Sequence, residues 1–193
     1  MDIVVNNLTK SFGELLVLNN FSAVFEEGKI TSIMAPSGTG KTTLLKILIG
    51  LIPCDSGTVT GLDGLSLGAV FQEDRLCENL SLVSNIKLVN RELDSAVILS
   101  AANEIGLEGC EAKPVRELSG GMKRRVSLLR ALLSKAEVLF LDEPFTGLDE
   151  QTKYSVIDFT KKYCAKRTVF YITHSLKEAE YFSDKILSVD SFV

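Results

Sequence analysis

The stretch Ala35-Pro36-Ser37-Gly38-Thr39-Gly40-Lys41-Thr42 decides the fold of this chain. An apolar run at 30–34 precedes it and a helical pattern at 43–51 follows it. Phosphate binding needs several backbone N–H groups that converge on one anion, and glycines leave space for that approach. Lys41 can reach the β- and γ-phosphates of a nucleotide, and the Thr42 hydroxyl can bind Mg²⁺. The stretch therefore predicts a nucleotide-binding loop between a strand and a helix. The residues expected to contact the nucleotide here are Pro36, Ser37, Gly38, Thr39, Gly40, Lys41, Thr42 and Thr43.

The composition excludes several classes of protein. A chain of 193 residues with 46% hydrophobic residues suits one domain with a sizeable core, and a net charge of −4 argues against a broad basic face for nucleic acid. Four dispersed cysteines and one histidine do not match a zinc centre or a disulfide framework. Met1-Asp2-Ile3 lacks the basic start of a signal peptide, and the apolar stretch 44–52 is too short to span a membrane. We therefore expect a soluble protein of a reducing compartment.

Hydrophobic periodicity predicts an α/β chain that forms a single domain over residues 1–193. Strands alternate with helices outside the segment of about 73–135, which has helical texture throughout and is interpreted as an insertion. This alternation predicts a mainly parallel sheet flanked by helices, preceded by a small antiparallel β-subdomain. The expected strands are 3–8, 15–25, 30–34, 58–60, 67–71, 138–141, 168–172 and 186–189. The expected helices are 43–51, 84–89, 95–105, 119–136, 151–164 and 176–182.

A second chemical motif is the apolar strand at 138–141, which ends in Asp142 and Glu143. The carboxyl end of a parallel strand lies at the same sheet edge as the phosphate loop, so both carboxylates are expected near the phosphates. Asp142 is placed to hold Mg²⁺, directly or through water. Glu143 is placed to act as general base on the attacking water.

A third motif, Leu118-Ser119-Gly120-Gly121-Met122, opens the longest expected helix. Ser119 is a favourable N-cap, and the two glycines leave the helix N-terminus open to an anion.

These motifs together resemble the ATP-binding domain of ABC transporters along nearly the whole chain. The phosphate loop resembles the Walker A motif of that family, 138–143 its Walker B motif, and 118–121 its signature sequence. Gln72 resembles the glutamine of the Q-loop, 146–149 the D-loop, and His174 the switch histidine. Phe12 stands where the family places an aromatic ring against adenine. The fold implied is a P-loop NTPase of the ABC ATPase type.

The resemblance implies a composite site for ATP and Mg²⁺ between two such domains. Ser119, Gly120 and Gly121 would face the γ-phosphate held by the partner's Lys41, and Asp149 would help to join the two sites. His174 would contact the γ-phosphate, and Gln72 would sense the metal and water. Glu143, His174 and Gln72 are thus the implied catalytic residues, and Thr42, Gln72 and Asp142 the implied metal ligands. We expect a homodimer, and a heterodimer fits the same motifs.

The chain departs from the family pattern at three places. Met122 replaces the usual glutamine of the signature, and Ala35 replaces the first glycine of the loop. The segment 57–68 is short, and we expect no regulatory domain after His174. The basic run Lys123-Arg124-Arg125 is interpreted as a solvated helix face.

The sequence predicts the Mg-dependent ATPase subunit of an ABC importer, most like those for nitrate, sulfonate or taurine. It would be cytoplasmic and bound to the inner face of the membrane through permease subunits, without nucleic acid as a partner. The alternatives are an exporter or lipoprotein-release subunit, a soluble ABC ATPase that acts on DNA or ribosomes, and a regulator without turnover. The intact Glu143 and His174 disfavour the last.

The segment 73–88 is predicted to border a groove for a permease helix, since it is richer in apolar residues than a solvated connector requires. Its apolar candidates are Leu76, Leu80, Leu82, Val83 and Ile86.

Overall fold

The computed structural model describes residues 1–36, 38–189 and 192. Five parallel strands form the central sheet, in the order β5-β6-β7-β3-β8. Their bounds are β3 Ile30–Met34, β5 Leu67–Val70, β6 Val138–Asp142, β7 Thr168–Ile172 and β8 Lys185–Ser188. A separate antiparallel sheet has the order β2-β1-β4, with β1 Ile3–Phe12, β2 Leu15–Phe25 and β4 Ser56–Thr60.

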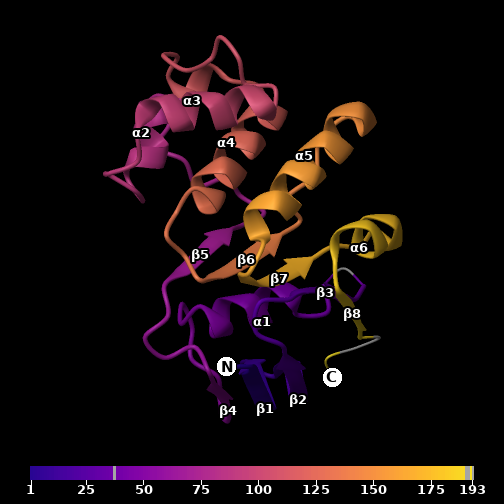
Figure 1. Cartoon of the computed structure of the whole chain (residues 1–193). Helices are drawn as coiled ribbons and strands as arrows, with labels where there is room; N and C mark the ends of the chain where they lie inside the picture. Colours follow the sequence, from indigo (N-terminus) through magenta and orange to yellow (C-terminus); the bar gives the residue numbers. More distant parts are fainter. Residues whose placement is uncertain (37, 190–191, 193) are drawn as a thin grey trace.

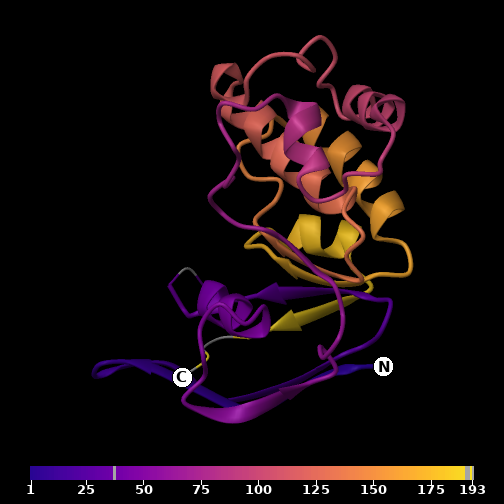
Figure 2. The same cartoon turned by 90° about the vertical axis from the view of Figure 1, so that its left-hand side faces the viewer.

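Helix α1 (Lys41–Leu48) lies between the two sheets (Figures 1 and 2). Its residues Leu44 and Leu45 are buried together with apolar side chains of β1 and β2 on one side and of β3, β6 and β7 on the other. The antiparallel sheet thus covers α1, and α1 covers one face of the parallel sheet. This sandwich fixes the start of α1, and with it the phosphate loop, against the sheet edge.

The other helices cover the opposite face of the parallel sheet and rise above it (Figure 1). They are α2 Leu82–Lys87, α3 Ser95–Glu104, α4 Gly120–Leu132, α5 Glu150–Cys164 and α6 Leu176–Phe182, with a 3₁₀ turn at Val115–Glu117. Strand β6 shows why two apolar faces are needed: Leu139 and Leu141 point to these helices, while Val138 and Phe140 point to α1. A strand buried on both faces has an uninterrupted run of apolar residues, and the run 138–141 is the pattern from which β6 was predicted.

The predicted α/β architecture is confirmed, with shifts at element ends. Strand β1 continues to Phe12 instead of ending at Leu8, because it pairs with β2 through several bulges down to Phe12 and Leu15. Helix α1 begins at Lys41 and is followed by Gly50 with a positive φ of 74°, so the prediction of 43–51 was two residues late and too long. Helix α4 ends at Leu132 instead of near 136, where Asn90 and Arg167 donate to its last carbonyls.

Candidate active site

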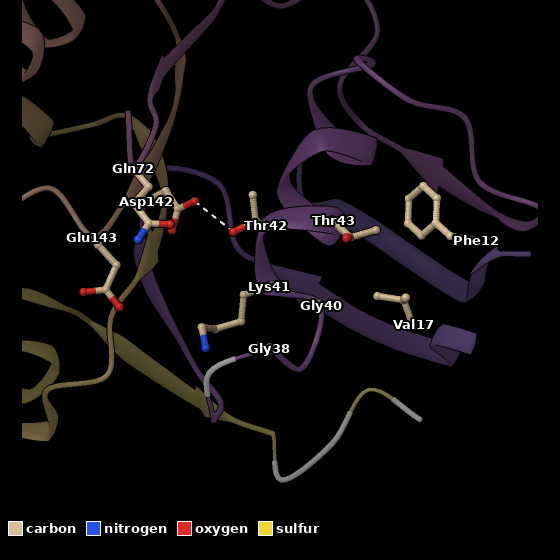
Figure 3. A pocket seen from close by; sticks show the side chains of 10 residues that line it. All are labelled: Phe12, Val17, Gly38, Gly40, Lys41, Thr42, Thr43, Gln72, Asp142 and Glu143. Atoms are coloured by element: carbon tan, nitrogen blue, oxygen red, sulfur yellow. Dashed lines mark hydrogen bonds between the residues drawn. The ribbon is translucent and has the colours of Figure 1, made fainter. Parts of the chain in front are cut away.

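The carboxyl ends of β3, β5 and β6 meet at one edge of the sheet and border a cavity of about 390 Å³ (Figure 3). Phe12 and Val17 lie at one end of this cavity, and Gln72, Asp142 and Glu143 lie at the other. The phosphate loop and the start of α1 lie between the two ends. The lining residues are Phe12, Val17, Gly38, Gly40, Lys41, Thr42, Thr43, Gln72, Asp142 and Glu143.

The phosphate loop depends on glycine at Gly40. Its φ of 107° disfavours any other residue, and an added Cβ would lie 2.8 Å from Cγ1 and 2.9 Å from the carbonyl oxygen of Val17. Lys41 Nζ curls back over the loop and donates to the carbonyls of Ala35 at 2.6 Å and Pro36 at 2.7 Å. Burial lowers the pKa of Lys41, and the nearby carboxylates of Glu143 and Asp142 oppose that shift. Among the described residues, the acceptors of this cation are therefore backbone carbonyls, with two carboxylates nearby.

Thr42 and Asp142 bring two oxygen groups together from α1 and β6. The Thr42 hydroxyl donates to Asp142 Oδ2 at 3.1 Å (Figure 3), and Asp142 is only 3% exposed. Burial raises the pKa of Asp142, the Thr42 hydrogen bond lowers it, and the charge of Glu143 raises it further. The amide of Gln72 lies at the same end of the cavity.

These groups fit Mg²⁺, which takes hard oxygen ligands, usually one or two carboxylates with water and substrate phosphates. A complete protein cage is not required for it. Accordingly, the described residues contain no cluster of three or more His, Cys, Asp or Glu side chains suited to a metal.

Both the backbone and the carboxylate of Glu143 make hydrogen bonds. Its φ of 51° is unusual for a residue with a side chain, and its N–H donates to the carbonyl of Ile172 at 3.0 Å. Its carboxylate accepts from Thr146 Oγ1 at 3.0 Å and contacts His174 Nδ1 at 2.8 Å. Because a carboxylate can only accept, we assign a proton to Nδ1 of His174. His174 itself is 69% exposed and therefore open to a second partner at its other ring nitrogen.

Phe12 and Val17 form an apolar wall at the opposite end of the cavity. The Phe12 ring, at the end of β1, is 51% exposed, and Lys10 Nζ lies 5.4 Å from its centre. An exposed ring on a cavity wall is a surface on which a planar base can stack.

His174 does not line this cavity but contacts Glu143, which does. Four further predicted site residues lie away from the cavity, at the N-termini of two other helices. Ser119 caps α4, accepting from Met122 N at 3.3 Å, with Gly120 and Gly121 as its first residues. Asp149 caps α5 and accepts from Thr152 N at 2.9 Å, and this bond lowers its pKa. A single chain therefore does not bring them to the phosphate loop.

Pro36 and Thr39 hold the phosphate loop together, whereas Thr43 faces the cavity. The carbonyl of Pro36 accepts from Thr39 Oγ1 at 2.8 Å and from Lys41 Nζ. Pro36 and Thr39 therefore shape the loop without lining the cavity. Thr43 does line the cavity. Ser37 lies outside the described residues.

The interpretation of 123–125 as a solvated face was wrong for Arg124. Arg124 is 5% exposed and donates into the site, where it reaches the backbone of both Asp142 and Glu143. Arg125 also turns inward, donating to the carbonyls of Ile105 and Gly106 after α3. Val17 and Thr146 were likewise missed as site residues. A charge in a basic run carries no sequence signal for burial, and the unbroken apolar run 15–18 does not tell which of its side chains faces the cavity.

The segment predicted to border a docking groove is partly buried. Leu82 and Ile86 are fully buried in the core of the helical part, and Leu76 and Val83 pack against that core. A hollow of about 180 Å³ is bordered by Glu73 and Arg75 at the start of this segment, and a larger one of about 480 Å³ lies beside its end, bordered by Phe71 and Val89 among others.

Among the described residues, no helix combines the length and apolar character needed to cross a membrane. The family model described as ABC transporter matches residues 18–146. The aliphatic sulfonates import ATP-binding protein SsuB 1 of Rhodococcus jostii is 37% identical, over 91% of this chain and 74% of that protein. The Nod factor export ATP-binding protein I of Burkholderia lata is 34% identical, over 95% of this chain and 66% of that protein. A solved dimeric structure of the bacterial ABC transporter cassette MJ0796 superposes with a TM-score of 0.86, at 26% identity, over 97% of this chain and 94% of that one.

Proposed function

The chain belongs to the ABC transporter ATPase family, and from this premise we propose that it hydrolyses Mg-ATP to power solute import. The observation that carries this proposal is the shared cavity, in which Lys41 at the start of α1 faces the same space as Asp142 and Glu143 at the end of β6. Each has a distinct task in phosphoryl transfer to water: charge neutralisation, metal binding and proton removal.

Nucleotide binding follows from the lysine and the aromatic wall. An incoming β- or γ-phosphate offers Lys41 an anionic acceptor in place of the carbonyls of Ala35 and Pro36. The helix N-terminus behind Gly40 adds its dipole. The base of the nucleotide would stack on Phe12 at the far end of the same cavity.

The metal would be held by Thr42, Asp142 and Gln72, and it would supply charge neutralisation of the phosphates. Asp142 is already paired with Thr42, so the two oxygen groups are preorganised for this task.

Hydrolysis would use Glu143 as general base. The carboxylate takes a proton from water while the water oxygen forms the bond to the γ-phosphorus, and the bond to the leaving ADP oxygen breaks. Each carboxylate oxygen has two acceptor sites, so Glu143 can accept from water while keeping His174 and Thr146. We assign His174 the task of orienting Glu143 and contacting the γ-phosphate with its exposed face.

The exposed signature and D-loop residues support a site completed by a second domain. Ser119, Gly120 and Asp149 are exposed at helix N-termini in the single chain. A second copy in head-to-tail orientation would bring its α4 N-terminus to the γ-phosphate. The solved cassette with the same fold is dimeric, which supports this arrangement.

Permease docking would hold the chain at the cytoplasmic face of the membrane. Leu88 and Val89, at the end of α2, are 53% and 46% exposed, and Val89 borders the hollow beside β5 and α4. Apolar anchors beside a hollow suit the end of a single helix from a membrane protein. This proposal moves the expected docking surface to the end of the segment 73–88 and one residue beyond.

Import is favoured by the likeness to the sulfonate import protein, and the likeness to the Nod factor export protein makes export the second candidate. Both use the same ATP chemistry.

The proposed function is tested by docking. Leu88→Asp with Val89→Asp should abolish co-purification with a membrane permease and leave ATP binding unchanged. Val97→Asp is a matched control, since Val97 is 45% exposed on α3, away from the hollow. Recovery of the unaltered chain with ribosomes or DNA instead of membranes would contradict the transporter assignment.

A further inference from the structure

We propose that Arg124 is a positioning residue for ATP hydrolysis, which holds Glu143 and the Q-loop at Gln72 in fixed relation to the signature helix α4. This inference rests on the proposed function. Its basis is one buried guanidinium that joins three segments of the site.

The contacts of Arg124 define the junction. Nη1 donates to the carbonyl of Phe71, to that of Gln72 at 3.2 Å and to Asp74 Oδ1 at 3.2 Å. Nη2 donates to the carbonyls of Asp142 at 2.9 Å and Glu143 at 2.6 Å. Four of these five acceptors are backbone carbonyls at the ends of β5 and β6.

The junction exists because two neighbouring strands separate at this point. The ladder between β5 and β6 ends with the pair Val70 and Leu141, and the chains diverge beyond it. The carbonyls that follow lose their cross-strand N–H partners, and the planar fork of an arginine can satisfy several of them at once. Neither lysine nor glutamine has enough donors in the right plane.

Glu143 depends most on this junction. Its left-handed backbone, with φ 51°, is fixed from one side by its N–H bond to Ile172 and from the other by its carbonyl, which accepts from Arg124 at 2.6 Å and from Thr146 N at 3.2 Å. Loss of Arg124 would leave that carbonyl with the longer bond from Thr146 N, and the strained backbone could then relax and turn the carboxylate away from the phosphates. Arg124 touches no substrate atom, so its effect on chemistry passes through Glu143 and Gln72.

Arg124 also ties these residues to α4. Arg124 lies five positions after Ser119, the N-cap of this helix. Ser127, one turn further along, donates to the carbonyl of Asp74 at 3.0 Å. A displacement of α4 would therefore carry the Q-loop and the catalytic carboxylate with it.

The test separates positioning from stability. Arg124→Gln should lower kcat at saturating Mg-ATP by about 10- to 100-fold, the usual range for loss of a group that orients an active-site ligand. The Kd for ATP measured in EDTA should stay within about threefold, because Lys41 and Phe12 are untouched. Arg124→Lys should recover part of the lost kcat, since an ammonium group keeps some of the carbonyl contacts.

The matched control is Arg167→Gln. Arg167 is a half-buried guanidinium that also donates to backbone carbonyls, of Leu132 at 2.9 Å and Ser134 at 3.2 Å, at the other end of α4. This variant should lose thermal stability but keep kcat within about twofold.

Equal kcat for Arg124→Gln and Arg167→Gln, or a parallel fall in kcat and ATP affinity, would overturn this inference alone. If Arg124→Gln does not fold, Arg124→Lys decides: the inference requires a lower kcat than wild type with unchanged ATP affinity. A wild-type chain that binds ATP but does not hydrolyse it would overturn the proposed function as well. The ATPase assay of the wild-type chain, done before any variant is made, recognises that outcome.

Discussion

Gly40→Ala tests the geometry of the phosphate loop. An alanine at φ 107° carries backbone strain of about 1–3 kcal/mol. Its Cβ would also lie 2.9 Å from the Val17 carbonyl oxygen and 2.8 Å from Val17 Cγ1, and overpacking of this kind costs about 1–3 kcal/mol. The sum is about 2–6 kcal/mol, which corresponds to a fall in Tm of roughly 4–24 °C for a domain of this size.

Gly38→Ala is the matched control in the same loop. Its φ of 80° gives comparable strain, but an added Cβ would meet no atom of the described residues within 4 Å. The difference in Tm between the two variants, measured on the nucleotide-free chain, therefore reports the contact with Val17. Adding Val17→Ala to Gly40→Ala should recover part of the loss, because the Cγ1 contact disappears while the carbonyl contact stays. Equal Tm values for Gly40→Ala and Gly38→Ala would refute the close approach of β2 to the loop.

Two further predictions concern charges in the cavity. Lys41→Ala should weaken ATP binding by about 10- to 100-fold in titration calorimetry, the range for a hydrogen bond to a charged group, with circular dichroism unchanged; unaltered affinity would contradict the loop assignment. Asp142→Asn should raise the Tm of the nucleotide-free chain at pH 7 by about 2–4 °C while lowering Mg-ATP turnover. Burial raises the pKa of Asp142, so its ionised form destabilises the folded state at pH values above that raised pKa. The gain should fade as the pH falls toward the ordinary value of 3.8, and a gain that persists there would have another cause.

The sequence predicted the elements that two-sided burial defines. Strand β6 reads as a continuous apolar run up to Asp142 because it is covered by α1 on one face and by other helices on the opposite face. The carboxylates at the end of β6 and the lysine that begins α1 could be placed at one edge, since parallel strands end together.

The residues that the sequence could not place depend on contacts between distant segments. Arg124 is buried because β5 and β6 separate above it, which no local pattern of charges reveals. Leu82 and Ile86 show an apolar helix face, but only the packing of α2 on α3 and α4 decides that this face is covered. Ser119 was predicted from its sequence as a helix N-cap, but its proposed place opposite a partner's phosphate loop came from the family resemblance, because the single chain does not bring it to its own loop.

The steady-state hydrolysis of Mg-ATP by the wild-type chain and by Glu143→Gln tests the central claim most directly. The amide keeps the shape of the side chain but cannot accept a proton from water, so turnover should fall by about 10²- to 10⁴-fold while ATP still binds. The ATP-loaded variant should accumulate as a dimer in size-exclusion chromatography, because the state before hydrolysis can no longer decay. Turnover by Glu143→Gln at the wild-type rate would contradict the account, since the catalytic base would then be a residue other than Glu143.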